Sequence, residues 1–238
     1  EYKVRLLYKE EIRTCGKDAK NIVSLGTAGF VMQLTNSLVS ICCNNVLSAT
    51  GGDVYVSVMT IISSVRQMIE TPIWSISEGS SPVISYNYGA KRPKKVIEAW
   101  ITMSVLALIY SLIAWSVILF APKFLIGIFS SDKSLMIDTV PAMKLYFSAF
   151  IFMLFQYTGQ TMFKSLNKKK QAIFFSILRK VIIVVPMTYM FPYVFHMGSN
   201  GVFMAEPVSN VIGGSLCFIV MLLTVLPELK QMNSDLSS

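Results

Sequence analysis

Six long apolar stretches constrain this chain more than any other feature of its sequence. Each is about as long as the roughly 17 to 25 residues that a helix needs to cross the hydrocarbon core of a membrane. The composition agrees, because 53% of the 238 residues are hydrophobic and 14% are charged, against about 25% charged in soluble domains. We therefore predict an all-α polytopic membrane protein, a bundle of six transmembrane helices. The predicted helices span residues 22–47, 54–84, 96–120, 140–163, 172–195 and 202–226.

Lysine and arginine are distributed unevenly between the two sides of these predicted helices. Fifteen lie on one side, in segment 1–21, loop 85–95, segment 164–170 and the C-terminal tail, whereas the loops of the other side hold Lys123 and Lys133. Basic residues are retained on the cytoplasmic side, so both termini are predicted to be cytoplasmic. The net charge of +8 then follows from topology. Anionic lipid head groups, not nucleic acid, are the expected partners of the basic clusters.

The four cysteines and the single histidine carry no sign of a metal centre or a catalytic site. The cysteines have no CxxC spacing, and His196 lies far from all of them in the sequence. No HExxH, G-x-S-x-G or paired-aspartate motif occurs. We therefore predict that the chain is not an enzyme, and that it has no catalytic residue, no metal site and no cofactor.

Polar side chains recur along one face of the predicted helix 22–47. Gln33, Asn36, Ser40 and Asn44 follow one another at intervals of three or four residues, which places them on one side of a helix. Lipid penalises such side chains, so this face must contact protein or water. Two interpretations stay open, namely hydrogen bonds between the helices of a dry bundle and the lining of an aqueous cavity.

The second predicted helix is too long for a simple crossing. With its continuation to Tyr88 it would measure about 52 Å, more than the roughly 30 Å of a hydrocarbon core. It must therefore tilt, bend or protrude. Pro72 and Pro82 each remove a backbone hydrogen bond, so we predict kinks at both. Pro186 is a further predicted hinge, in the fifth helix.

The same helix carries polar and charged side chains close to one another. Gln67, Trp74 and Glu78 lie at helical spacing, and Arg66 and Glu70 are four residues apart beside them, near enough to pair. An unpaired charge at this depth costs about 2.5–3.5 kcal/mol on insertion scales. Either the pair is structural, or Glu70 or Glu78 takes up a proton or an organic cation.

The later predicted helices contain further polar residues. Arg179 and Lys180 are predicted to be anchors whose charged ends reach the membrane surface. Glu206 is predicted to cap its helix or to help pack the lobe. Further candidates for a substrate site are Gln156, Tyr157, Gln160 and Asn210.

The stretch from Glu78 to Lys95, EGSSPVISYNYGAKRPKK, ends a long apolar helix with a proline, aromatic residues, an asparagine, a glycine and a basic cluster. It resembles the loop after the second helix of a lobe in multidrug and toxic compound extrusion (MATE) transporters. Other landmarks of that family occur in the same order along the chain. They are Leu25-Gly26, Gly51-Gly52-Asp53, Pro72, Ser81-Pro82, Tyr86-Asn87-Tyr88-Gly89-Ala90, Ser176 with Leu178-Arg179, and Ala205-Glu206-Pro207.

The resemblance implies a two-lobed, twelve-helix exporter in the cell (inner) membrane. Such a protein alternates between inward-open and outward-open states, is driven by entry of H⁺ or Na⁺, and exports cationic or amphiphilic drugs and toxins. The chain begins with Glu1 and lacks a signal peptide, so we expect it to be the C-terminal half, partnered by an N-terminal six-helix lobe. Residues 1–21 would be the cytoplasmic inter-lobe linker, 22–226 the transmembrane lobe and 227–238 the cytoplasmic tail.

The chain also departs from the family. Some branches place one acidic residue in the first helix of this lobe and another in the fourth, but residues 22–47 and 142–163 contain no Asp or Glu. On this resemblance that cation site is missing, and the coupling acid could lie in the other lobe. The alternative function is a flippase of lipid-linked saccharides from the same wider superfamily, which a strongly cationic cavity would favour because its cargo is anionic.

Overall fold

The computed structural model describes residues 16–235, and within this range it contains helices and short connections without any strand. The predicted all-α class is confirmed. Most of the predicted linker 1–21 and the last three residues of the predicted tail lie outside the described residues. The helices are α2 (Gly16–Gly89), α3 (Pro93–Phe120), α4 (Pro122–Phe129), α5 (Lys133–Tyr146), α6 (Phe150–Ser165), α7 (Lys169–Ile177), the π-helix η1 (Leu178–Val184), α8 (Val185–Tyr193), α9 (Ser199–Ser209), the π-helix η2 (Asn210–Gly214) and α10 (Ser215–Asp235).

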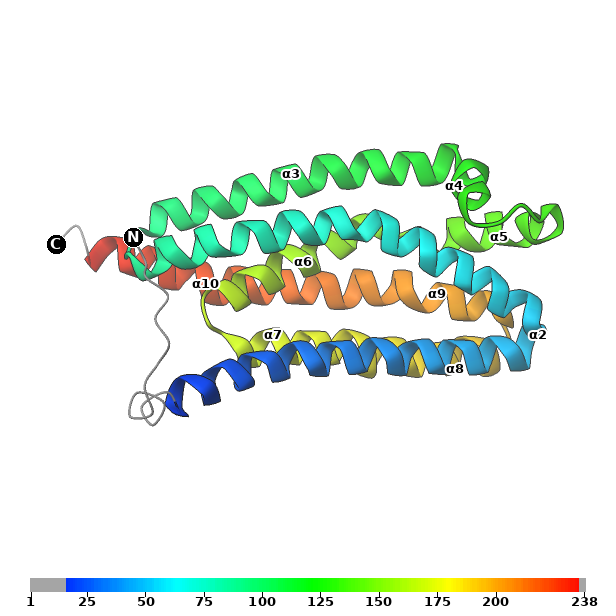
Figure 1. Ribbon diagram of the computed structural model, residues 1–238, viewed down its shortest axis with the longest axis horizontal. Coiled ribbons are helices and arrows are strands. Elements are labelled where there is room, and N and C mark those ends of the chain that lie inside the picture. Colours follow the sequence, from blue (N-terminus) through cyan, green and yellow to red (C-terminus); the bar gives the residue numbers. More distant parts are fainter. Residues whose placement is uncertain (1–15, 236–238) are drawn as a thin grey trace, which may run out of the picture.

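Helix α2 doubles back on itself at one end of the bundle (Figure 1). Its 74 residues would reach about 110 Å as one straight helix. The reversal occurs at Gly52, whose φ of 70° and ψ of −169° are readily adopted only by glycine. A side chain on the neighbouring Gly51 would lie 2.3 Å from Ser199 Oγ, so α9 begins in close contact with the turn. We call residues 16–51 the first arm of α2 and residues 53–89 the second arm.

The lengths and composition of the helices are compatible with the six predicted crossings. Four helices in the described range are long and apolar enough to span a membrane, or five if α5 and α6, which are bent by 51°, form one broken span. One of the four, Gln33–Gly89, contains the reversal at Gly52 and so supplies parts of two arms. At the bend between α5 and α6, the Phe147 carbonyl accepts two hydrogen bonds, one from the Phe150 N–H at 3.1 Å and one from the Trp115 indole at 3.0 Å, so α3 is tied to the bend.

The prolines have different consequences in different helices. Pro72 and Pro82 lie within the second arm of α2, where no residue beyond Gly52 leaves the helical region, so the kinks there stay a prediction. Pro186 is near the start of α8, directly after the π-helix η1. Pro207 lies three residues before the π-helix η2. Each of these two prolines lacks an N–H, which interrupts the backbone hydrogen bonds of its helix. The adjacent π-helix, η1 or η2, accommodates this interruption.

The basic loops lie together at one end of the bundle. Figure 1 shows the start of α2, the connection from α2 to α3, the connection from α6 to α7 and the end of α10 at this end, opposite the reversal at Gly52. We call it the basic end. Two ion pairs join helices here, Lys164 with Glu78 at 2.8 Å and Lys168 with Glu228. The clustering agrees with the predicted charge asymmetry, while the side of the membrane stays a prediction.

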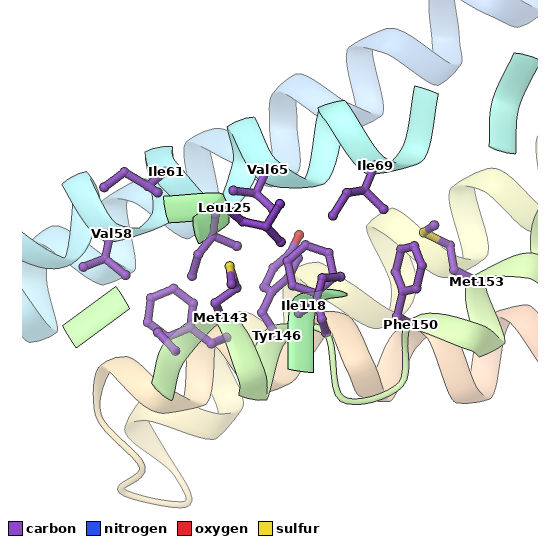
Figure 2. Packing of buried hydrophobic residues seen from close by; sticks show 14 of the residues in the cluster. Val58, Ile61, Val65, Ile69, Ile118, Leu125, Met143, Tyr146, Phe150 and Met153 are labelled. Carbon is purple, nitrogen blue, oxygen red and sulfur yellow. The ribbon is translucent and has the colours of Figure 1, made fainter. Parts of the chain in front are cut away.

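A buried apolar cluster packs one face of the second arm of α2 against α3, α4, α5 and α6 (Figure 2). Val58, Ile61, Val65 and Ile69 recur at intervals of three or four residues and are at most 8% exposed. They therefore form a stripe on one side of this arm. The opposite side carries Ser63, Gln67, Thr71 and Trp74, so the core stripe directs these side chains away from the bundle's centre. The residues labelled around the stripe in Figure 2 are Ile118, Leu125, Met143, Tyr146, Phe150 and Met153.

Candidate functional site

A cavity of about 320 Å³ lies between the two arms of α2 and reaches α5, α6, η1 and α9. Charged, polar, aromatic and aliphatic side chains share its walls, which is typical of sites that bind small organic molecules. The first arm of α2 contributes Asn36, Val39, Ser40 and Cys43, the second arm Met59, Ser63, Arg66, Gln67, Glu70, Thr71 and Trp74, and the other helices Tyr146, Tyr157, Lys180, Val184, Val202 and Glu206.

Arg66 connects three helices at the wall of this cavity. Its Nε pairs with Glu70 Oε1 one turn along the same helix, which confirms the predicted pair. Its Nη1 donates a 2.6 Å hydrogen bond to the Tyr146 hydroxyl on α5, and its Nη2 lies 3.0 Å from Glu206 Oε1 on α9. The planar guanidinium can hold several partners at once because its donors form a rigid fork. Arg66 thus anchors α2 to α5 and α9.

Glu206 lies between two arginines and is almost completely buried. Oxygen Oε1 accepts a hydrogen bond from Arg179 and forms an ion pair with Arg66, and the Glu206 side chain is 7% exposed. Its predicted capping role is wrong, because α9 begins at Ser199 and Glu206 lies two turns inside it. Its other predicted role, packing of the lobe, agrees with these contacts. Sequence reasoning missed the Arg66 partner because it comes from a distant part of the chain.

Arg179 and Lys180 were predicted to be surface anchors, and that prediction is wrong for both. The Arg179 side chain is 4% exposed and paired with Glu206, so its charge is neutralised inside the protein and need not reach the surface. A side chain on Gly213 would come within 2.9 Å of Arg179 Cγ, which shows how closely η2 covers it. Lys180, the next residue of η1, instead lines the cavity. Among residues 16–235 it has no hydrogen-bonding or ion-pair partner.

Of the two carboxylates at the cavity, Glu70 is the more exposed and has the weaker partners. Oε1 pairs with Arg66, and Oε2 accepts a 3.1 Å hydrogen bond from the Tyr157 hydroxyl on α6. Its side chain is 16% exposed, compared with 7% for Glu206. Glu206 contacts two arginines, whereas Glu70 contacts one arginine and a neutral phenol. Of the two carboxylates, Glu70 is therefore the one that can exchange a partner at lower cost.

Cations outnumber carboxylates in and immediately behind this cavity. Arg66, Arg179 and Lys180 lie near Glu70 and Glu206. Lys180 interacts electrostatically with the other four groups, and Glu206 interacts with all three cations. Ions removed from water are stabilised only when they are paired and hydrogen-bonded. The two arginines meet this condition through the carboxylates, which leaves one positive charge, that of Lys180, without a fixed partner.

The structure brings together many of the residues that the sequence marked as candidates. Cavity-lining positions are occupied by Asn36, Ser40, Gln67, Arg66, Glu70, Trp74 and Tyr157. These come from both arms of α2 and from α6, so the polar faces predicted separately for two helices meet at one cavity. The lining interpretation of the first-arm stripe fits Asn36 and Ser40. Their role in binding stays a prediction.

The other candidates lie away from the cavity lining. Gln33 and Asn44 are exposed on the first arm of α2, and Gln33 accepts from the Asn36 side-chain amide at 3.4 Å. Glu78 pairs with Lys164 at the basic end. Three further candidates are buried in α6 and η2, behind the cavity. Each of them has one side-chain polar atom without a hydrogen-bond partner among the described residues. This group is Gln156, Gln160 and Asn210.

Metal-binding chemistry finds no support in this part of the chain. Within residues 16–235, no three side chains of His, Cys, Asp or Glu gather closely enough to hold an ion. The cysteines described there are free, and burial raises the cost of forming a thiolate. The cavity thus offers charge, hydrogen bonds and apolar surface, which are the means of reversible binding.

Comparison with known proteins bears on the fold of the chain. The MatE family model matches residues 29–190. No curated protein matches the chain. Three solved structures share its fold at 18–19% sequence identity. One is a MATE in the straight conformation (TM-score 0.81, 19% identity, 92% of this chain and 48% of that one). Another is an outward-facing multidrug resistance MATE family transporter of the MOP superfamily (0.83, 18%, 98% and 50%). The third is a MOP superfamily transporter from Pyrococcus furiosus that is described as having a binding pocket of reverse polarity (0.80, 19%, 92% and 48%).

Proposed function

The chain belongs to the MatE family, and from this we propose that it is one lobe of a secondary active transporter that exports amphiphilic drugs or toxins. Entry of H⁺ or Na⁺ would drive export, and alternation between two lobes would move the substrate across the membrane. The single observation that carries the proposal is a cavity between helices of a predicted membrane bundle, whose wall holds a carboxylate, Glu70, between an arginine and a tyrosine.

Glu70 has the surroundings that a coupling group needs. It must hold one partner in one state and another partner in the next, and the difference in affinity between the states drives the change. Arg66 can keep its contacts with Glu206 and Tyr146 when Glu70 leaves it. Glu70 is then free to take a proton, a Na⁺ ion or the substrate. We propose Glu70 as the coupling carboxylate of this lobe.

A second lobe is part of the proposal. The chain spans about half the length of the solved transporters it matches. The mouth of the cavity carries exposed polar and aromatic side chains, among them Asn36, Gln67 and Trp74, which lipid would disfavour. A facing lobe would cover them and complete the substrate site. The sequence-based expectation that this is the C-terminal lobe, with the other lobe N-terminal to it, stays a proposal.

The charge balance bears on the proposed substrate. A cationic drug would need a carboxylate to receive it, and both carboxylates of this cavity already contact arginines. Recognition of a cation would therefore depend on Glu70 leaving Arg66, or on acids of the second lobe. An amphiphile without strong positive charge meets no such requirement. We therefore propose that the substrate is recognised mainly by its amphiphilic character, and that a positive charge on the substrate is less important.

The lipid-linked saccharide flippase remains the second candidate function. The excess of cationic over acidic side chains in and immediately behind this cavity is the observation that favours it, since its cargo is anionic. Reconstitution can separate the two functions. A flippase would move a polyprenyl-linked anionic lipid between leaflets, whereas the exporter would carry soluble amphiphiles across the vesicle membrane.

The test is ion-driven transport by the full-length protein in lipid vesicles. Glu70→Gln keeps the shape and hydrogen bonding of the side chain and removes its charge, so it should abolish accumulation driven by a pH or Na⁺ gradient while the protein folds normally. Glu98→Gln is the matched control, because Glu98 forms an exposed pair with Lys95 at 2.7 Å and such pairs contribute little. Unchanged gradient-driven transport by Glu70→Gln would refute the coupling role.

A further inference from the structure

We infer that the cavity binds the anionic group of an amphiphilic substrate, and that the Lys180 ammonium is the group that receives it. The inference rests on the proposed transport function and names a substrate class for the same cavity. Lys180 projects from η1 to the cavity wall. Within residues 16–235 it makes no ion pair and no hydrogen bond, although it is partly buried.

The two carboxylates of the cavity are not available to Lys180. Glu206 Oε1 is shared by Arg66 and Arg179. Glu70 is held by Arg66 and by the Tyr157 hydroxyl. The ammonium feels both arginines as repulsive charges and both carboxylates as attractive ones, but neither carboxylate lies within ion-pair distance of it.

An ammonium at membrane depth without a partner is costly, because hydrocarbon cannot replace its water. The site therefore gains most from a ligand that brings a negative charge. Glu70 and Glu206 offset the charges of Arg66 and Arg179, so the five groups together keep one positive charge, and an anion that contacts Lys180 meets a net attraction. A carboxylate, sulfonate or phosphate group satisfies this condition.

The rest of the wall selects an apolar body to accompany the anion. Val39, Met59, Val184 and Trp74 line the same cavity, and Trp74 is 52% exposed. Such side chains bury hydrocarbon or aromatic surface and leave little for a small inorganic anion to contact. The ligand class is thus an organic amphiphile with one anionic group. A purely cationic compound is the poorer ligand of this lobe.

The experiment compares two probes that differ by one negative charge and one methyl group. Dansyl-phenylalanine, with a free carboxylate, and its methyl ester are titrated by fluorescence against the purified full-length transporter in nanodiscs of neutral phosphatidylcholine. We expect the wild type to bind the carboxylate form more tightly than the ester. Lys180→Met should weaken binding of the carboxylate form by about tenfold, as expected for one lost charge-assisted contact, and leave the ester unaffected.

Two further variants keep the result interpretable. Lys180→Arg retains the charge and should retain the preference for the carboxylate form. Lys123→Met removes an exposed lysine of α4 and should change neither probe. Lys180→Met should also fold at least as well as the wild type, because it removes a charge without a fixed partner. If the second lobe supplied a carboxylate to Lys180, this variant would instead lose thermal stability and affect both probes equally, which would overturn the inference.

A membrane lipid and a soluble compound could both supply the anion. Replacing part of the phosphatidylcholine by phosphatidylglycerol distinguishes them, since a bound lipid head group would compete with the carboxylate probe and a soluble ligand would be displaced only by soluble anions. No saturable binding of the carboxylate form in neutral nanodiscs overturns the inference. Gradient-driven transport of the ester in that case would still support the proposed function, whereas transport of neither probe would count against both.

Discussion

The ion pairs at the cavity and those at the basic end use the same residue types in different surroundings. At the cavity the side chains of Glu206 and Arg179 are 7% and 4% exposed. At the basic end those of Glu78 and Lys164 are 37% and 34% exposed. Water can therefore solvate the second pair when it opens, but it cannot solvate the first. Burial makes the cavity charges depend on one another and leaves those at the basic end almost independent.

The difference also separates two uses of charge in a membrane protein. Lysines at the basic end remain near water, where they can interact with lipid head groups, and their pairs with Glu78 and Glu228 join neighbouring helices. Charges at the cavity lie where hydrocarbon would penalise them, so each one needs a specific partner. The charged residues of the cavity are therefore costly for folding, and Lys180 has no fixed partner among the described residues. Such a cost indicates a functional role.

The largest effect should follow removal of the acid that both arginines share. Glu206→Gln leaves Arg179 buried beside a neutral amide, so we expect it to lower the free energy of unfolding by about 3–5 kcal/mol. The equivalent change at the basic end, Glu78→Gln, removes the acid of the more exposed pair with Lys164 and should cost about 0–1 kcal/mol. Thermal unfolding of the two purified full-length variants measures the difference. Equal losses would mean that burial does not distinguish the two regions.

A smaller loss is expected when Glu70 loses its arginine. Arg66→Met leaves Glu70 with the Tyr157 hydroxyl alone, at a cost of about 1–3 kcal/mol. The double variant Arg66→Met with Glu70→Gln removes both charges and should recover much of the protein yield. It should not recover gradient-driven transport, because the coupling carboxylate is gone. A double variant that transports normally would remove Glu70 from the proposed mechanism.

Close packing around Arg179 should be sensitive to a single methyl group. A Cβ on Gly213 would lie 2.9 Å from Arg179 Cγ, so Gly213→Ala must displace the arginine from Glu206 and should cost about 1–2 kcal/mol through overpacking. At the basic end a Cβ on Gly89 would meet nothing within 4 Å. Gly89→Ala is therefore the control and should leave the melting temperature unchanged. A neutral Gly213→Ala would indicate that Arg179 can reposition freely.

Salt should affect the two regions differently, although this effect is the smallest. Raising the ionic strength from about 0.1 M to 1 M shortens the screening length from about 10 Å to 3 Å. The stability difference between wild type and Glu78→Gln should therefore shrink in high salt. The deficit of Glu206→Gln should persist, since ions do not reach the buried pair. Thermal unfolding at both salt concentrations tests this, and loss of the Glu206→Gln deficit at 1 M would contradict the assigned burial.

Much of the fold was predictable because it depends on local sequence. An apolar stretch long enough to cross a membrane satisfies its own backbone hydrogen bonds only as a helix, and the gap between the predicted helices 22–47 and 54–84 contains the reversal of α2 at Gly52. The Arg66 and Glu70 pair was predictable for the same reason, since residues four apart on a helix are always neighbours. The uneven distribution of lysines and arginines predicted that the basic segments lie at one end of the bundle, the end that Figure 1 shows opposite the reversal of α2.

Only the tertiary structure decided which charges meet. Glu206 and Arg66 are on different helices, and no local pattern relates them, because their contact depends on how α2 and α9 pack. The π-helices were also unpredicted, and they contain Arg179, Lys180 and Asn210. A charged residue in a membrane helix either reaches the surface or finds a buried partner. The sequence by itself established that such charges exist here, and packing alone determined that Arg179 is paired and Lys180 faces the cavity.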